Sequence, residues 1–485
     1  MSEIRQWNTE WIYAKVPWDE IDVNDQLHGQ EVVLPHTWYS DEDYYQGEAA
    51  YQKKFTYKQT EGCRVFVKFY GVDRESYIIL NGQKLCHHQG GYNIFTVELT
   101  GALVDGDNLM TVLVSNAKTD KISPLSGDFA VFGGIHRKVE LITTGEACFD
   151  RTYYGTDGVV LQTKSVDGIN SLWADVRVLG ATDYSVVYTI SDGDEILAEA
   201  SDDHEAGMHE ICQVENVKNW NGLDDTALYT VRVVLMVDGE IVDEVSRKVG
   251  FREIAIDANN GFFLNKVHTK LRGVAKHQDS AKVYSAATME NWRKDMDLIH
   301  EIGANAVRLS HYPHPQEVYD LCDEMGFVVW AEIPLLKLTE DDELFENAKY
   351  QLTEMILQNM HHPSIAFWGL QNEIAIYGEF PYMTEKVQLL NELAHHLDDT
   401  RFSACANLNV VHSDSSLNKI TDVTAYNIYY GWYYGEFEDH GAFLDEFHNT
   451  NPNMPLAISE YGADTNIIFH SDNPQVSDYT EEYQA

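Results

Sequence analysis

Ser364-Ile-Ala-Phe-Trp-Gly-Leu-Gln-Asn-Glu373 is an apolar, strand-like run that ends in polar side chains, the last of them a glutamate. Pro455-Leu-Ala-Ile-Ser-Glu460 repeats this arrangement further along the chain. A buried strand that delivers an acid at its carboxyl end is how a (β/α) barrel presents catalytic groups. Two acids facing one cleft suit hydrolysis of a glycosidic bond, one as acid/base and one as nucleophile. A lone glutamate here could simply end a strand in solvent, but the repeat favours the paired interpretation.

Around these two runs, the residues after Gly261 alternate between strand-like and helix-like patterns. Helices are predicted over 288–303, 315–325, 343–360, 383–398 and 440–448, and strands over 271–274, 304–310, 327–333, 364–370, 402–406, 423–426 and 456–459. Such alternation with short loops predicts a parallel sheet, and seven strands indicate a TIM barrel. The count places Glu373 at the end of strand four and Glu460 at the end of strand seven. It also predicts a (β/α)8 barrel truncated before strand 8, hence a fragment with open sheet edges and poor solubility.

The preceding residues are rich in short strands. Over residues 1–145 turn signals such as Asn81-Gly82 separate alternating runs, which predicts a jelly-roll sandwich with a sugar-binding character. Residues 146–254 repeat this texture and predict an immunoglobulin-like sandwich without its disulfide. The expected order is therefore jelly roll, immunoglobulin-like domain and, over 255–485, an incomplete catalytic barrel.

Composition restricts the partners. The 485 residues carry 34 basic against 78 acidic side chains, a formal net charge of −44 that repels nucleic acid and anionic membrane. No run of about 18 apolar residues and no signal-peptide pattern occurs, so we expect a cytoplasmic protein with no membrane partner. The six cysteines are scattered, which favours free thiols over a disulfide framework or a zinc site. The oligomeric state stays open, a homo-oligomer included.

Several motifs, in order along the chain, resemble the family 2 glycoside hydrolases, the β-galactosidase and β-glucuronidase group. They are Val33-Leu-Pro-His-Thr-Trp38, Phe132-Gly-Gly-Ile-His-Arg137, Leu271-Arg-Gly-Val-Ala-Lys-His-Gln-Asp279, Gly303-Ala-Asn-Ala-Val-Arg-Leu-Ser-His-Tyr-Pro313, Gln371-Asn-Glu373 and Ser459-Glu-Tyr-Gly462. The resemblance spans nearly the whole chain. It implies the same three-domain order and a retaining mechanism.

The resemblance also implies roles for individual residues. Glu373 is expected to be the acid/base and Glu460 the nucleophile. Further substrate-binding positions are expected at Asp128, His277, Arg308, His311, Asn372, Asn427, Tyr429 and Trp432. Among these, Asn372 would bond the sugar 2-hydroxyl and Arg308 would keep the nucleophile ionised, although Arg308 could instead form a structural salt bridge. Asp128 would reach over from the first domain, and its alternative is an ordinary loop aspartate.

Cofactors and substrate are less constrained. Some β-galactosidases of the family carry a magnesium-binding histidine after strand three, whereas this chain has Ile333-Pro-Leu-Leu-Lys-Leu338. No metal ligands and no required cofactor are therefore predicted, and the sequence gives no support for weakly bound Mg or Na. The main expectation is a retaining exo-β-galactosidase acting on small-molecule β-galactosides. The alternative is a β-glucuronidase. The carboxylate of a glucuronide is expected to be bound by basic side chains, and few of these flank the strand ends (Lys276, Arg308, Lys337). A non-catalytic carbohydrate-binding protein ranks third, because it would be expected to lack one acid.

Overall fold

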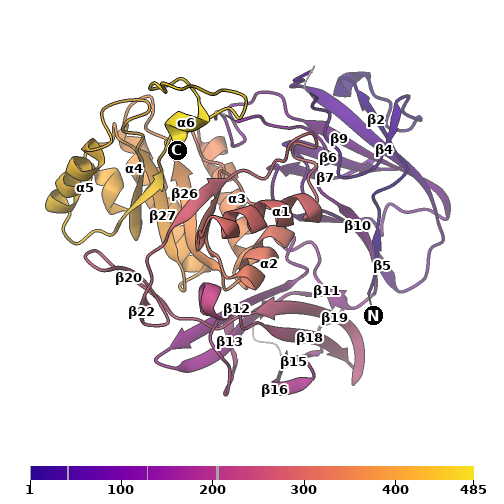
Figure 1. Ribbon diagram of the computed structural model, residues 1–485. Helices are drawn as coiled ribbons and strands as arrows, with labels where there is room; N and C mark the ends of the chain where they lie inside the picture. The colour runs from indigo at the N-terminus through magenta and orange to yellow at the C-terminus, as the bar shows by residue number, and fades with distance from the viewer. Residues whose placement is uncertain (1, 41–42, 128, 204–206) are drawn as a thin grey trace.

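The computed structural model describes residues 2–40, 43–127, 129–203 and 207–485. Two β-rich units and a mixed barrel make up the molecule, and the chain passes through them in that order (Figure 1). In the view of Figure 1 the first unit lies to the right of the barrel and the second lies below it. Asp128, expected at the sugar site, lies outside the described residues.

The first unit consists of two antiparallel sheets. A six-stranded sheet has the order β3-β2-β4-β9-β6-β7, and a four-stranded sheet has the order β1-β10-β5-β8. A shared apolar core that includes Trp11, Tyr51 and Phe69 fills the space between them. The predicted Asn81-Gly82 hairpin joins β6 to β7, with both residues at positive φ as a two-residue turn requires. The strands are β1 (Glu3–Gln6), β2 (Trp11–Lys15), β3 (Gln30–Val32), β4 (Glu48–Tyr57), β5 (Cys63–Phe69), β6 (Glu75–Leu80), β7 (Gln83–Gln89), β8 (Phe95–Glu98), β9 (Gly106–Ser115) and β10 (Val139–Gly145).

The second unit is a smaller sandwich. Sheets of order β12-β13-β17 and β16-β15-β18-β19 enclose a core that includes Tyr188 and Phe251. A short antiparallel sheet, β20-β21-β22, follows and places Phe262 and Leu264 against the barrel residues Trp330 and Phe367. The strands are β11 (Cys148–Phe149), β12 (Val159–Val166), β13 (Ile169–Val176), β14 (Val178–Leu179), β15 (Ser185–Asp192), β16 (Glu195–Asp202), β17 (His209–Gln213), β18 (Tyr229–Val237), β19 (Glu240–Val249), β20 (Ile254–Asp257), β21 (Gly261–Leu264) and β22 (Val267–His268).

The barrel confirms the alternating pattern expected from the sequence. Its seven described strands are all parallel and run in sequence order from β23 to β29, with those two strands at the edges. The strands are β23 (Gly273–Lys276), β24 (Ala306–Leu309), β25 (Val328–Glu332), β26 (Ile365–Asn372), β27 (Phe402–Leu408), β28 (Val423–Asn427) and β29 (Leu456–Glu460). The helices are α1 (Met289–Glu301), α2 (Gln316–Met325), α3 (Asp342–Asn359), α4 (Pro381–Leu397), α5 (Asp439–Thr450) and α6 (Glu481–Gln484).

Local signals fix the ends of these helices. Thr288 precedes α1, and its backbone N–H donates to Asn291 Oδ1 at 3.0 Å. Gly303 follows α1 with φ +82°, the left-handed conformation that glycine adopts at no steric cost. Asp341 caps α3, because its carboxylate accepts from the backbone N–H groups of Glu343 and Leu344.

Helix α3 docks the first sandwich onto the barrel. His88 on β7 contacts Glu354 of α3 at 2.9 Å, and both side chains are buried. One helical turn on, the Gln358 amide exchanges hydrogen bonds with the backbone of Ile94 at 3.1 and 2.9 Å. Because buried polar groups must be satisfied across this junction, the sandwich has a defined position relative to the barrel.

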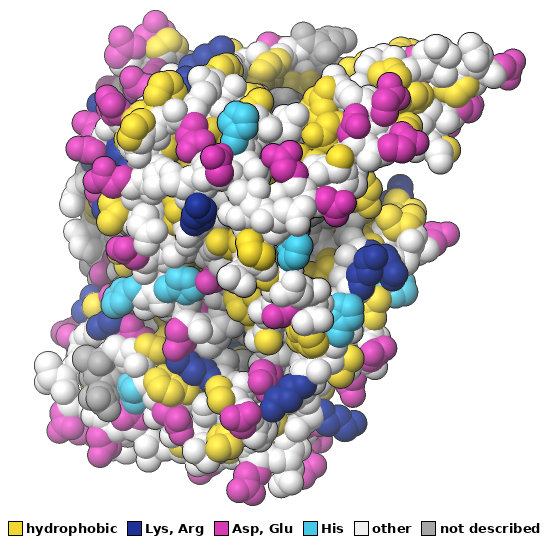
Figure 2. All heavy atoms as spheres, turned by 90° about the vertical axis from the view of Figure 1, so that its left-hand side faces the viewer, with side chains coloured by type: hydrophobic (Ala, Val, Ile, Leu, Met, Phe, Trp, Pro, Cys, Tyr) yellow, Lys and Arg dark blue, Asp and Glu magenta, His cyan; other side chains and the backbone are white. Residues whose placement is uncertain are grey.

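The surface reflects the charge of the chain. Over the face that carries α4 and α5, acidic side chains are scattered among a few basic ones rather than gathered in one block (Figure 2). The six cysteines are free. Among the described residues no helix combines the length and the apolar character needed to cross a membrane.

Candidate active site

Polar side chains gather at one edge of the barrel sheet. Since the strands are parallel and paired in order, their carboxyl ends lie together. Charged and amide side chains within or just after the strands gather at these ends, among them Arg308 (β24), Glu332 (β25), Asn372 and Glu373 (β26), Asn427 (β28) and Glu460 (β29). The structure therefore brings together both glutamates expected from the sequence and several of their predicted neighbours.

Arg308 lies at the centre of this group. Its Nη1 donates to Glu460 Oε1 at 2.5 Å, while Nε and Nη2 donate to the two oxygens of Glu332 at 2.9 and 3.0 Å. Burial alone would lower the pKa of Arg308, but Glu332 and Glu460 outweigh burial and raise it. The guanidinium is thus a fixed cation that presents hydrogen bonds to the Glu460 carboxylate.

Glu332 is a site residue that the sequence analysis did not assign. Its side chain is fully buried and accepts from Arg308 and from His311, whose Nδ1 lies 2.7 Å from Glu332 Oε1. Burial opposes ionisation, but Arg308 and the His311 hydrogen bond outweigh it and hold the pKa of Glu332 below its usual value. The available signal was its place at the end of an apolar strand, the pattern shared by Glu373 and Glu460.

Two further side chains contact Glu460 from other directions. The Tyr429 hydroxyl donates a short hydrogen bond to Glu460 Oε2. Burial, and next the Glu460 charge, raise the pKa of Tyr429, so the phenol keeps its proton and stays a donor. His311 Nε2 lies 3.6 Å from Glu460 Oε1. One oxygen of Glu460 is therefore held by Arg308 and the other by Tyr429.

Glu373 has different surroundings. Asn427 Nδ2 donates to Glu373 Oε1 at 2.7 Å and lies 3.1 Å from Asn372 Oδ1. Ser459 donates to Asn427 Oδ1 at 2.7 Å, which fixes the amide so that its NH₂ group faces Glu373. Glu373 itself has φ +55°, and its N–H bonds the Ala406 carbonyl at 2.8 Å. A non-glycine residue held in this left-handed conformation is strained, and such strain often accompanies functional sites.

His277 and Trp432 relate differently to this cluster. His277 Nδ1 lies 2.9 Å from the Tyr312 hydroxyl, and its ring centroid is 5.3 Å from that of His311, so His277 borders the site. Trp432 is 2% exposed and packs on Tyr479 and Tyr483 near the end of the chain. Its sugar-binding role stays a prediction.

A metal could be held elsewhere. Among the residues that the structure describes, Asp320, Asp323 and His362 bring three ligand atoms within 4.8 Å of one another. His362 precedes β26, whereas Glu373 follows it, so the eight residues of the strand separate this group from the glutamates. His362 Nδ1 and Asp323 Oδ2 already lie 2.6 Å apart, as in an ordinary buried hydrogen bond.

Family models match nearly the whole chain. Residues 24–145 match the sugar binding domain of the glycosyl hydrolases family 2, residues 160–252 match the model described as glycosyl hydrolases family 2, and residues 254–485 match its TIM barrel domain.

Known proteins agree with these matches. A beta-glucuronidase from Bacteroides fragilis is 35% identical over 472 residues, which cover 92% of this chain and 67% of that protein. A beta-galactosidase from Thermoanaerobacter pseudethanolicus is 29% identical over 422 residues, covering 82% of this chain and 55% of that protein. The crystal structure of an FMN-binding beta-glucuronidase from Facaelibacterium prausnitzii L2-6 is 36% identical with a TM-score of 0.93, covering 100% of this chain and 76% of that one.

Proposed function

The chain belongs to glycosyl hydrolase family 2, and from this membership we propose that it is a retaining exo-glycosidase acting by double displacement. Glu460 is the nucleophile and Glu373 the acid/base. The observation that carries the proposal is the unequal setting of the two carboxylates. Glu460 accepts hydrogen bonds from a buried guanidinium and a phenol, whereas Glu373 accepts one from the neutral amide of Asn427. A nucleophile must stay ionised and an acid must hold a proton, and only different environments allow both.

Different side chains act in nucleophilic attack and in proton transfer during the first step of hydrolysis. Arg308 and Tyr429 hold the two oxygens of Glu460, which orients the carboxylate for attack on the anomeric carbon. Glu373 gives its proton to the departing oxygen and later takes one from water. The Asn372 carbonyl accepts from Arg308 at 2.8 Å and from Asn427 at 3.1 Å, so the Asn372 NH₂ group is oriented to donate to the sugar 2-hydroxyl.

For the sugar, we propose a β-glucuronide first and a β-galactoside second. Relatives at 35–36% identity are named beta-glucuronidase, against 29% for the beta-galactosidase. This order is the reverse of the one expected from the sequence, which placed the galactoside first because few basic residues flank the strand ends. Of the three basic residues near the strand ends, Lys276 pairs with Asp295 at 2.7 Å and Arg308 pairs with glutamates. Lys337, beside the Tyr377 ring, pairs with no carboxylate among the described residues and could meet a substrate carboxylate.

Hydrolysis of nitrophenyl β-glucuronide and nitrophenyl β-galactoside by the protein tests both the retaining mechanism and the choice of sugar. We expect turnover of at least one of them, a higher kcat/KM for the glucuronide, and a β-configured first product by NMR. A higher kcat/KM for the galactoside would reverse the sugar assignment. An α-configured first product would exclude the retaining mechanism.

A further inference from the structure

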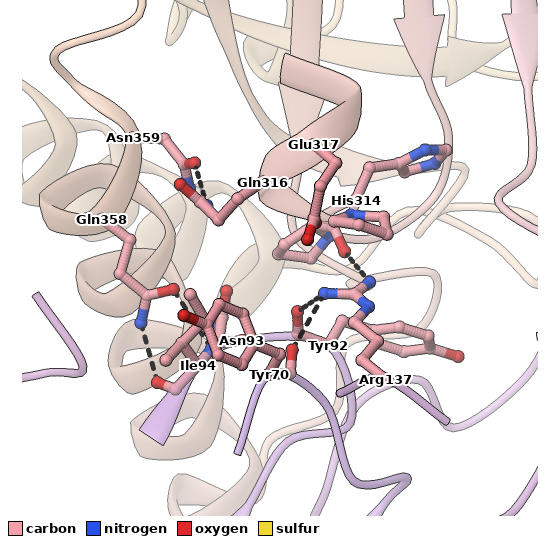
Figure 3. Close-up of a pocket in the computed structure, with 12 residues that line it drawn as sticks. Tyr70, Tyr92, Asn93, Ile94, Arg137, His314, Gln316, Glu317, Gln358 and Asn359 are labelled. Atoms are coloured by element: carbon pink, nitrogen blue, oxygen red, sulfur yellow. Dashed lines mark hydrogen bonds between the residues drawn. The ribbon is translucent and has the colours of Figure 1, made fainter. Parts of the chain in front are cut away.

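Arg137 ends the motif Phe132-Gly-Gly-Ile-His-Arg137, which the candidate active site does not explain. The side chain is 4% exposed and reaches from the first sandwich into the barrel (Figure 3). Nη1 stays within the sandwich and donates to the carbonyls of Tyr92 at 2.5 Å and Tyr70 at 3.3 Å. Nη2 crosses the junction and donates to Gln278 Oε1 and to the Pro313 carbonyl, both at 2.8 Å.

All four acceptors of Arg137 are uncharged. Burial lowers the pKa of Arg137 to about 10, so the guanidinium still carries its charge at neutral pH. A buried cation without a hydrogen-bonded carboxylate is costly, and the four hydrogen bonds from Nη1 and Nη2 offset part of that cost, while Nε has no hydrogen-bond partner among the described residues. What the planar guanidinium provides here is a rigid set of donors in fixed directions. Such a group is suited to holding two backbone segments in register.

The two barrel acceptors belong to loops that carry predicted site histidines. Gln278 is the neighbour of His277 in the loop after β23. Pro313 comes two residues after His311 in the loop after β24. One guanidinium from another domain therefore holds both loops, beside His311, which lies 3.6 Å from Glu460, and beside His277, whose ring packs on that of His311.

A second contact follows the same route. The Tyr92 ring stacks on Tyr312, with centroids 4.1 Å apart and planes 8° apart. The Tyr312 hydroxyl in turn lies 2.9 Å from His277 Nδ1. Because Arg137 bonds the Tyr92 carbonyl, the guanidinium and the stacked rings form one connected support.

We propose that Arg137 is a positioning residue: through Gln278, Pro313 and Tyr92 the first sandwich sets the places of His277 and His311 for the glycoside hydrolysis proposed above, on which this inference rests. The pocket drawn in Figure 3, about 10 Å³ in volume, is too small for a sugar. The junction is thus a packed support and not a second binding site.

Arg252 offers a matched control. It extends from the second sandwich region, is 7% exposed, and donates to the carbonyls of Pro363 at 2.6 Å and Ile365 at 2.5 Å. Burial lowers its pKa to about 9. These carbonyls lie at the start of β26, the end opposite Glu373. Arg252 therefore resembles Arg137 in burial and bonding but supports the other end of the barrel.

The test compares Arg137→Met with Arg252→Met at equal folded fraction, using a glycoside that the wild type hydrolyses. We expect kcat/KM to fall about 100-fold for Arg137→Met, because small displacements of positioned groups have effects of this size. Arg252→Met should change kcat/KM less than about 3-fold, well below that scale, despite a similar loss in Tm. Arg137→Lys keeps the positive charge but lacks the planar, forked donors of arginine, and its kcat/KM should lie between those of Arg137→Met and the wild type. Equal kcat/KM values for the two methionine variants would overturn the proposal.

A readout that does not depend on turnover separates this inference from the proposed function. In protein labelled with ¹³C in its histidine rings, the signals of His277 and His311 are assigned with His277→Gln and His311→Gln. Arg137→Met should shift both signals and Arg252→Met neither. Unshifted signals in Arg137→Met would refute the positioning role even if the wild type is active. A wild type that hydrolyses no glycoside would refute the proposed function while this spectrum still decides the role of Arg137.

Discussion

Arg308 Nη1 lies 2.5 Å from Glu460 Oε1, and Nε and Nη2 of this guanidinium donate to Glu332 and Asn372. One cation thus stands between two carboxylates of unequal accessibility. Glu332 is fully buried, while the Glu460 side chain is 16% exposed. Glu332 therefore holds Arg308 from the buried side, and Glu460 is the more exposed of the two carboxylates.

The first prediction separates the roles of the two glutamates. Glu460→Gln should abolish turnover, because an amide cannot form the glycosyl intermediate. Glu373→Ala should slow hydrolysis, and azide should restore part of the rate with an activated leaving group that needs no proton. Steady-state rates with and without azide measure both. Rescue confined to the Glu460 variant would mean that the roles are exchanged.

Tyr429→Phe should lower kcat/KM by about 10- to 100-fold. It removes one hydrogen bond to a carboxylate, worth about 1.5–3 kcal/mol. Tyr430→Phe is the matched control, since the Tyr430 ring packs on His440 and Phe443. If both phenylalanine variants retain full activity, the Tyr429–Glu460 hydrogen bond does not contribute to catalysis.

Arg308→Lys should lower kcat/KM by at least about 100-fold, because a lysine keeps the charge but loses the planar arrangement of donors. The control is Arg401→Lys. Arg401 is also buried, and it bonds Asp398 at 2.9 Å and the carbonyls of Met360 and His362, which precede β26. Arg401→Lys should reduce Tm while leaving kcat/KM of the folded enzyme nearly unchanged. A comparable kinetic loss in both variants would show that Arg308 acts only through stability.

Glu332→Gln should change how stability depends on pH. The folded-state pKa of Glu332 lies below its ordinary value of 4.5. The ionised carboxylate therefore stabilises the folded state above pH 4.5, and this stabilisation is lost as the pH falls through the folded-state pKa. Breaking this buried ion pair should reduce the free energy of unfolding at neutral pH by about 3 kcal/mol. Denaturant unfolding should show that the difference in free energy of unfolding between wild type and variant becomes smaller below pH 4.5.

Glu346→Gln is the control for this measurement, because the Glu346 side chain is 66% exposed. Its stability should follow that of the wild type at every pH. A gap between wild type and Glu332→Gln that stays constant into acid would contradict the pH assignment for Glu332.

The elements of the barrel were predictable because their signals are local. Helix α1 lies between Thr288 and Gly303, whose capping and left-handed conformations depend only on adjacent residues. Glu373 and Glu460 were recognisable because each ends an apolar run, and strand order in a parallel sheet follows from right-handed βαβ connections. The expected strand positions, fourth and seventh, are confirmed.

The sequence by itself thus determined the order of elements and the edge of the sheet where the acids meet. Only the tertiary structure distinguished the three strand-end glutamates. Glu332, Glu373 and Glu460 have similar sequence settings, but their hydrogen-bond partners belong to other strands and loops, 21 to 152 residues away in the chain. Arg308 lies 152 residues from Glu460 and Arg137 lies 176 residues from Pro313. Such pairings carry no periodic or capping signal, because they form only when separate strands and domains pack together.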